Sequence, residues 1–129
     1  MAKEYETKKY VKYIEIHITC PNTETAERIA NSLVNNKYAA CVQILDTGKS
    51  VYLWNWKIEK QNEVLLLVKT RGRYFKRIEK TVRELHPYTT PEIIALPIIK
   101  ANDEYTRWID ESLGLKIVDF ENDKAVKND

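Results

Sequence analysis

Glycine is scarce in this sequence, which has only 3 glycines among its 129 residues: Gly48, Gly72 and Gly114. They lie too far apart to form a G-x-G-x-x-G fingerprint or a glycine-rich phosphate loop, so the Rossmann and P-loop classes are excluded. Cysteine is scarce as well, because Cys20 and Cys41 are too few for a disulfide scaffold. The two lack C-x-x-C spacing, so no zinc ribbon or thioredoxin-type site is encoded locally.

Long apolar runs and an excess of one charge are also missing. The longest apolar run, Val64–Val68, is far shorter than the ~20 residues that cross a bilayer. Residues 1–12 are polar and lack the apolar core of a signal peptide. The net charge is only +2, and the basic cluster at 69–80 is interleaved with glutamate. We therefore expect a soluble cytoplasmic protein with no direct membrane insertion and no nucleic-acid partner.

The apolar residues change their period along the chain, which predicts an alternation of strands and helices. Ile14, Ile16 and Ile18 alternate with polar residues and indicate a half-buried strand. Asn22 or Thr23 can cap the helix that follows. The expected elements are a strand at 11–20, a helix to about 36, a strand at 39–45, a turn or bulge at 46–49, an extended segment at 50–58, a polar turn at 59–62, a strand at 63–70, a helix at 73–86, a strand at 91–100 and a helix at 102–113.

This order, β-α-β-β-α-β followed by a helix, predicts an α+β fold of the ferredoxin-like type. We expect an antiparallel sheet with helices on one face, a long β-hairpin whose first arm runs from about 39 to 58, and an extra C-terminal helix. Pro97 interrupts the last strand, which favours an edge, a bulge or a strand end. The domain is expected at 11–114. A flexible segment at 1–10 precedes it, and an extension at 115–129 follows with a short strand and a frayed tail.

Three large aromatic residues, Tyr52, Trp54 and Trp56, are expected on one face of the extended segment at 50–58. Such a stripe can stack nucleotide bases, but a stacking platform usually lies beside a basic groove. Large aromatic side chains on a projecting hairpin more often mark a surface that another protein covers. We therefore expect this stripe to pack against a neighbouring subunit.

His86, Cys20 and Cys41 are the residues that favour metal chemistry. His86 lies at a helix end before Pro87, where it is either a metal ligand or general base, or a helix cap that packs under Tyr88. Cys41 is either a small buried hydrophobe or a thiolate ligand, and Cys20 is expected to be more exposed. Thiolate and imidazole together favour copper or zinc. Because the chain has only 2 histidines and no close ligand spacing, a labile site or one shared between subunits fits better than a closed four-ligand site.

Charged residues at strand ends are the remaining candidates. Lys69 closes an apolar strand and is expected to pair with Glu92 or Glu63, either in a salt bridge or as an acid/base pair. No Ser/His/Asp set can be assigned from the sequence. We therefore expect a protein that is not an enzyme.

Five segments of this chain form a pattern in their order and spacing. They are AACVQI at 39–44, SVYLW at 50–54, EVLLLVKT at 63–70, HPYTTPEIIALPI at 86–98 and YTRWI at 105–109. Over about residues 12–113 this pattern resembles the CutA family of divalent-cation tolerance proteins. The resemblance implies a ferredoxin-like subunit and a tight homotrimer, similar in architecture to the PII signalling proteins, in which long hairpins reach over neighbouring subunits.

The resemblance also implies a role and a set of site residues. The family is linked to tolerance of copper and other divalent cations, and His86 matches a histidine proposed there as a copper ligand. Some members have a cysteine where this chain has Ile18, and Cys20 is a weak substitute for it. Trp56 stands where the family usually has glycine. We expect a homotrimer that binds copper or another divalent cation, without an organic cofactor, through His86 with Cys20 or Cys41.

A second function stays open beside this one. A PII-like signalling or scaffold trimer would bind a small molecule or a partner protein in the clefts between subunits. In that case Lys69, Tyr88, Glu92 and Trp54 are the residues expected to line the cleft.

Overall fold

The computed structural model describes residues 11–115 of the chain. Its elements are β1 (Tyr13–Cys20), α2 (Thr23–Asn35), β2 (Cys41–Trp54), β3 (Lys57–Arg71), the short 3-10 helix η1 (Gly72–Tyr74), α3 (Phe75–Leu85), β4 (Ile93–Pro97) and α4 (Asp103–Ser112). The expected helices and strands are confirmed, except in the segment from 46 to 62. The predictions for 1–10 and for the extension after 115 lie outside the described residues.

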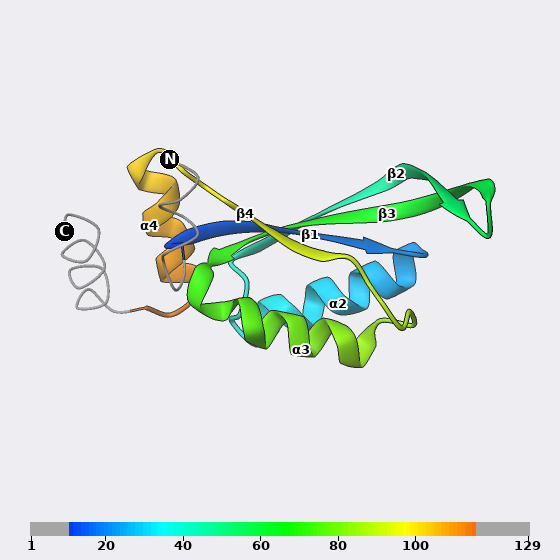
Figure 1. Cartoon of the computed structure of the whole chain (residues 1–129). Coiled ribbons are helices and arrows are strands. Elements are labelled where there is room, and N and C mark those ends of the chain that lie inside the picture. Colours follow the sequence, from blue (N-terminus) through cyan, green and yellow to red (C-terminus); the bar gives the residue numbers. More distant parts are fainter. Residues whose placement is uncertain (1–10, 116–129) are drawn as a thin grey trace.

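The four described strands form one antiparallel sheet in the order β2-β3-β1-β4. Figure 1 shows α2 and α3 together beneath one face of this sheet. Two interleaved βαβ units produce this strand order, and it confirms the expected α+β, ferredoxin-like fold. Among the described strands β4 pairs with β1 alone, so Pro97 lies on an edge strand, where a missing N–H is tolerated.

The sheet face that meets α2 and α3 forms the core. Ile14, Ile16 and Ile18 are buried there, which confirms the period of two in β1. The expected cap of α2 is also present, because Oδ1 of Asn22 accepts the backbone N–H of Thr25 at 2.8 Å. The alternate residues of β1 point away from the helices, to the face that we call the open face.

β2 and β3 form a long hairpin that extends past the rest of the sheet (Figure 1). Their ladder runs to the pair Trp54 and Lys57, so the turn consists of Asn55 and Trp56 and the expected polar turn at 59–62 is wrong. Both turn residues have positive φ, 51° and 66°, as a two-residue hairpin turn requires. Most of 59–62 is exposed because it lies in the projecting arm. Polarity alone therefore does not distinguish this strand segment from a turn.

Two further expectations concern this hairpin. The register of the ladder shifts between Leu45 and Gly48, which confirms the expected bulge. Tyr52 and Trp54 share one face of β2, because they are two residues apart. Trp56 lies in the turn instead, so the expected stripe of three aromatic residues is wrong in its last member.

Polar contacts hold α4 against one end of the open face. Asp110 of α4 is fully buried, with its Oδ1 2.6 Å from Nη1 of Arg71, and its Oδ2 accepts the hydroxyl proton of Tyr13 at 2.6 Å. Ile109 of α4 is buried, whereas Trp108 is 43% exposed. The buried stripe of this short helix runs through residues 109 and 110, so Trp108 lies at its margin.

Candidate functional site

His86 follows the last residue of α3 and is buried between that helix and the end of β1. Its Nε2 lies 2.7 Å from the carbonyl oxygen of Thr19, and its Nδ1 accepts the N–H of Tyr88 at 3.1 Å. A carbonyl oxygen only accepts hydrogen bonds, so Nε2 carries the proton and Nδ1 the lone pair. Both ring nitrogens are therefore bonded to the main chain. A metal ion can bind this ring only after one of the two bonds is broken.

The ring of His86 also packs on Tyr88, with 4.8 Å between the ring centroids. From Tyr88 a chain of hydrogen bonds runs to the hairpin. Gln61 Nε2 donates to the Tyr88 hydroxyl at 3.1 Å, and the Tyr52 hydroxyl donates to Gln61 Oε1 at 3.0 Å. The histidine thus belongs to a set of contacts that ties the hairpin to the loop after α3.

The two cysteines lie on opposite faces of the sheet. Cys20 is fully buried on the core face, so its expected exposure is wrong. The pKa of its thiol is raised to about 11, mainly by burial and to a smaller extent by the charge of Glu63. Cys41 is half-buried and pairs with Lys69, whose side chain lies on the open face. Cys20 pairs with Val64, five residues from Lys69 along β3, which is about 17 Å.

The structure therefore does not bring all three expected metal ligands into one site within the chain: His86 bonds the carbonyl of Thr19, the residue before Cys20, whereas Cys41 lies on the opposite face of the sheet. Between residues 11 and 115, no group of three or more His, Cys, Asp and Glu side chains could hold a metal ion. The expected cleft residues are also apart: Trp54 pairs with Lys57, twelve residues along β3 from Lys69, which is about 40 Å. Within one copy of the chain these residues line no common cleft.

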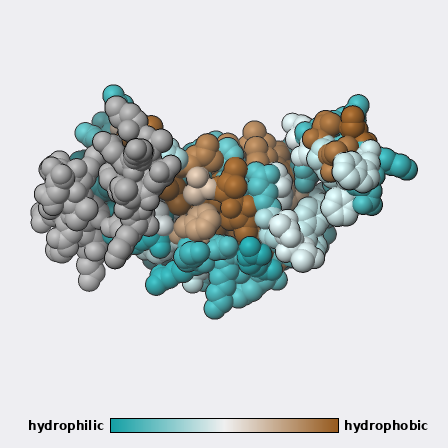
Figure 2. All heavy atoms as spheres, viewed as in Figure 1, coloured by the Kyte–Doolittle hydropathy of each residue, from teal (hydrophilic) through white to brown (hydrophobic). Residues whose placement is uncertain are grey.

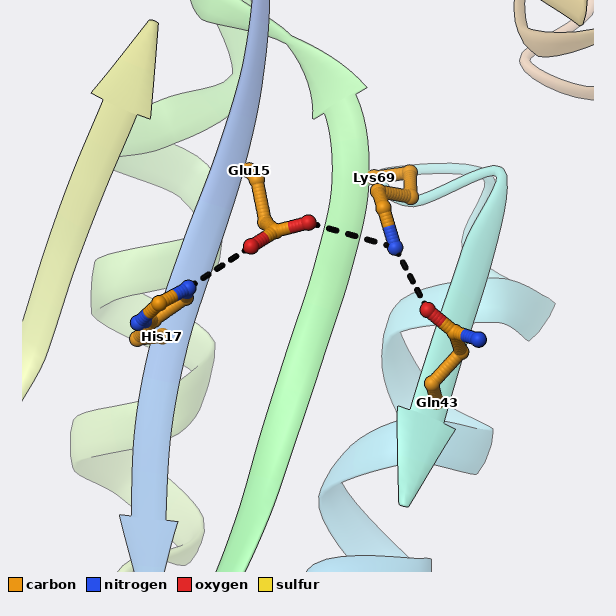
Figure 3. A network of polar contacts seen from close by, with 4 residues as sticks. All are labelled: Glu15, His17, Gln43 and Lys69. Carbon is orange, nitrogen blue, oxygen red and sulfur yellow. Dashed lines mark hydrogen bonds and ion pairs between the residues drawn. The ribbon is translucent and has the colours of Figure 1, made fainter. Parts of the chain in front are cut away.

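A network of four polar side chains crosses the open face instead (Figure 3). Lys69 of β3 donates to Oε1 of Gln43 in β2 at 2.6 Å, and its Nζ lies 3.3 Å from Oε1 of Glu15 in β1. Oε2 of Glu15 lies 2.7 Å from Nε2 of His17. The salt-bridge partner of Lys69 is therefore Glu15, and the expected pairing with Glu92 or Glu63 is wrong. The reason is the register, which places Lys69 directly opposite Glu15.

This network has an electrostatic signature at its centre. The pKa of Glu15 is held below its ordinary value, mainly by the hydrogen bond with His17. The hydrogen bond and the charge of Lys69 lower this pKa further, whereas burial opposes the shift. Sequence reasoning assigned Glu15 and His17 to the polar side of the first strand but gave them no role. The available signal was their spacing, because residues i and i+2 of a strand project side by side.

Apolar side chains surround the network and cover the hairpin. Leu45, Ile94 and Leu96 are exposed at open-face positions, opposite Leu65, His17 and Glu15 respectively. In the projecting part of the hairpin, from residue 51 to 58, the exposed apolar side chains are Val51, Tyr52, Leu53, Trp54, Trp56 and Ile58. Figure 2 shows hydrophobic residues gathered over the middle of the molecule and at the hairpin end, above a hydrophilic band. Exposed patches of this kind mark interaction surfaces.

The family model of the CutA1 divalent ion tolerance protein matches residues 14–112 of this chain. The chain belongs to this family. The divalent-cation tolerance protein CutA of Thermus thermophilus is 45% identical over 97 residues, which are 75% of this chain and 94% of that protein. The solved CutA1 structure from Oryza sativa has a TM-score of 0.77 at 36% identity and covers 85% of this chain and 99% of that one. For the CutA structure from Archaeoglobus fulgidus, the TM-score is 0.75 at 44% identity, with 78% and 98% covered.

Some relatives carry the name of a compartment, and one of these is a longer protein. The chain is 40% identical to the chloroplastic CutA of Arabidopsis thaliana over 107 residues, 83% of this chain but 59% of that protein. The structure from Archaeoglobus fulgidus is described as that of a periplasmic protein. Within residues 11–115 no helix is both long and apolar enough to cross a membrane. The cytoplasmic location of this chain stays a prediction.

Proposed function

We propose that this protein is a homotrimer that contributes to divalent-cation tolerance by binding copper or another divalent cation, without catalysing a reaction. Membership in the CutA1 family carries the metal part of the proposal. The relatives from Thermus thermophilus and Archaeoglobus fulgidus bear the name divalent-cation tolerance protein. The specific cation, the trimer and the absence of catalysis are our proposals.

The exposed apolar residues support the assembly part. A monomer would leave Leu96 of the open face and Trp54 of the hairpin in contact with water. The sheet also has two edges, β2 and β4, whose outer sides are unpaired within the described residues. A second and third copy of the chain can cover both kinds of surface at once. This is the arrangement that the family resemblance predicts.

The assembly is tested by measuring the molar mass of the full chain in solution by light scattering, with a charge placed on the open face. We expect a mass of three copies for the wild type and a smaller species for Leu96→Glu. Val34→Glu is the matched control, because Val34 is 43% exposed on α2 and Leu96 is 41% exposed on β4. A monomeric wild type contradicts the proposed trimer. Equal effects of the two variants contradict the role of the open face.

Metal binding is tested on the same protein by titration with copper and zinc salts, followed by calorimetry. We expect saturable binding of at least one of these ions. No binding of either ion by the assembled wild type would contradict the metal part of the proposal and leave the trimer untouched.

A further inference from the structure

We propose that Tyr88, held in place by His86, is a latch that fixes the direction of the hairpin arm relative to the sheet. We define the arm as residues 48–63, the part of the β2–β3 hairpin beyond the register shift. This role is separate from the proposed metal binding and concerns the His86-Pro87-Tyr88 segment. Only its consequence for assembly rests on the proposed homotrimer.

The arm has no hydrophobic core of its own to hold it. β1 pairs with β3 only from Val64 to Arg71, so within the arm β3 has β2 as its only described partner strand. Of the described residues that form the hydrophobic core, none lies between 48 and 63. A two-stranded ribbon is marginally stable alone, and a bulge at its base is a point where strands bend and twist. Packing against the core therefore does not fix the direction of the arm.

One hydrogen bond connects the arm to the rest of the described chain, apart from the ladder that the arm continues. Nε2 of Gln61 donates to the hydroxyl of Tyr88 at 3.1 Å, and the two residues are 27 positions apart in sequence. Within the arm, the hydroxyl of Tyr52 donates to Oε1 of Gln61 at 3.0 Å, which orients the amide. The two bonds run from β2 through β3 to the loop after α3. They tie the arm to the body of the domain at a single polar point.

Tyr88 can hold the arm because His86 fixes its position. The N–H of Tyr88 donates to Nδ1 of His86 at 3.1 Å, and the two rings pack with 4.8 Å between their centroids. His86 is buried, and its Nε2 bonds the carbonyl of Thr19 at the end of β1. Its backbone N–H donates to the carbonyl of Val82 in α3 at 2.8 Å. A buried ring with both nitrogens bonded keeps one orientation, so the Tyr88 hydroxyl is presented from a rigid base.

The direction of the arm decides which surface of a second copy it can reach. A cyclic assembly closes only when each copy meets its neighbour at the same fixed rotation. The arm carries large exposed apolar side chains, Trp54 among them, and the proposed homotrimer covers them. An arm that swings about the bulge would meet its neighbour at varied angles and favour incomplete or open assemblies. The latch therefore prepares the arm for closure of the trimer, and the partner of the arm is a second copy of this chain.

The latch is tested with Tyr88→Phe, which keeps the ring on His86 and removes only the hydroxyl. Hydrogen exchange of the full-length chain, followed by mass spectrometry, measures how readily the arm opens. We expect the amides of 48–63 to exchange about fivefold faster than in the wild type, as loss of one hydrogen bond allows, with exchange in α2 unchanged. Tyr38→Phe is the matched control. Its ring is also half-buried beside another tyrosine, but its hydroxyl makes no hydrogen bond within residues 11–115.

A double-mutant cycle separates the latch from a general structural role. Gln61→Met breaks the same hydrogen bond from the side of the arm. The double variant should therefore exchange no faster in the arm than Gln61→Met alone. Additive effects of the two substitutions overturn the inference, as does unchanged exchange of the arm in Tyr88→Phe.

Light scattering of the same variants over a dilution series follows the consequence for assembly. We expect Tyr88→Phe to lose the trimer at protein concentrations at which the wild type and Tyr38→Phe keep it. A Tyr88→Phe trimer as stable as that of the wild type overturns the role of the latch in closure. A monomeric wild type contradicts the proposed homotrimer instead, and the exchange measurement then still decides whether Tyr88 holds the arm.

Discussion

Asp110 of α4 and Arg71 at the end of β3 form a buried ion pair, with 2.6 Å between Oδ1 and Nη1 and side chains that are 0% and 1% exposed. The guanidinium carbon also lies 4.9 Å from the ring centroid of Tyr13. The pair connects the last described helix to the first and third strands of the sheet. Removing one member of a buried pair takes a countercharge from the other, which is strongly unfavourable.

We predict that Asp110→Ala lowers the free energy of unfolding by about 3–5 kcal/mol, because the buried guanidinium loses the carboxylate that lies 2.6 Å from its Nη1. Urea denaturation at a fixed protein concentration measures the change. The matched control is Glu24→Ala, which removes an exposed partner of Arg28 on α2 and is expected to cost less than about 0.5 kcal/mol. Equal losses in the two variants would show that the buried pair does not stabilise the fold.

Tyr13 predicts a loss of stability in alkaline solution. The pKa of Tyr13 is raised from 10.0 to about 12, mainly by burial and next by the hydrogen bond with Asp110. The unfolded chain therefore loses this proton before the folded chain does. The stabilisation is complete below the unfolded pKa and is lost as pH rises from about 10 to about 12. Tyr13→Phe should show a flatter decline of the unfolding free energy over this range, and an identical decline in both proteins would count against the raised pKa.

The hairpin turn predicts a difference between two variants at one position. Trp56 is 92% exposed and adopts φ of 66°, a left-handed conformation that only glycine adopts without a steric cost. Trp56→Gly and Trp56→Ala both remove the indole, but only the glycine variant also removes the backbone strain. We expect Trp56→Gly to be more stable than Trp56→Ala by about 1 kcal/mol, measured by thermal or urea denaturation. A more stable alanine variant would contradict the left-handed turn.

We predict that the thiol of Cys20 is protected from alkylation in the native protein. Its pKa is raised to about 11 and its side chain is fully buried, so little thiolate is present near neutral pH and reagents cannot reach it. Alkylation of the native protein with iodoacetamide, followed by mass spectrometry of the peptides, should leave Cys20 unmodified. The same treatment in concentrated urea should modify it fully. Rapid modification of Cys20 in the native protein would show that the strand end opens readily.

The sequence predicts those parts of the fold that local patterns encode. The alternation at Ile14, Ile16 and Ile18 predicted β1, and the cap at Asn22 predicted the start of α2. Extending that alternation by one step would also have placed Cys20 on the core face. The salt bridge between Glu15 and Lys69 could not be found in this way, because it depends on the register of two strands that are far apart in sequence.

The position of the hairpin turn was predicted wrongly for a different reason. Local polarity separates strands from turns only where one strand face is buried. Residues 59–62 lie in an arm beyond the core, and the turn signal at Asn55 and Trp56 has no glycine to mark it. The sequence singled out His86 and Cys41 only as separate candidates. Their hydrogen bonds and the faces to which they point required the structure.

The long hairpin also bears on the order in which the chain folds. Its ladder joins residues that are close in sequence, beginning at Trp54 and Lys57, and such a hairpin forms in microseconds. β1 must instead find β3 and β4 across long intervening segments, which costs more loop-closure entropy and is slower. We therefore expect the arm to exist before the centre of the sheet does. The polar network of Glu15, His17 and Lys69 would then be completed late, when β1 docks beside a hairpin that has already formed.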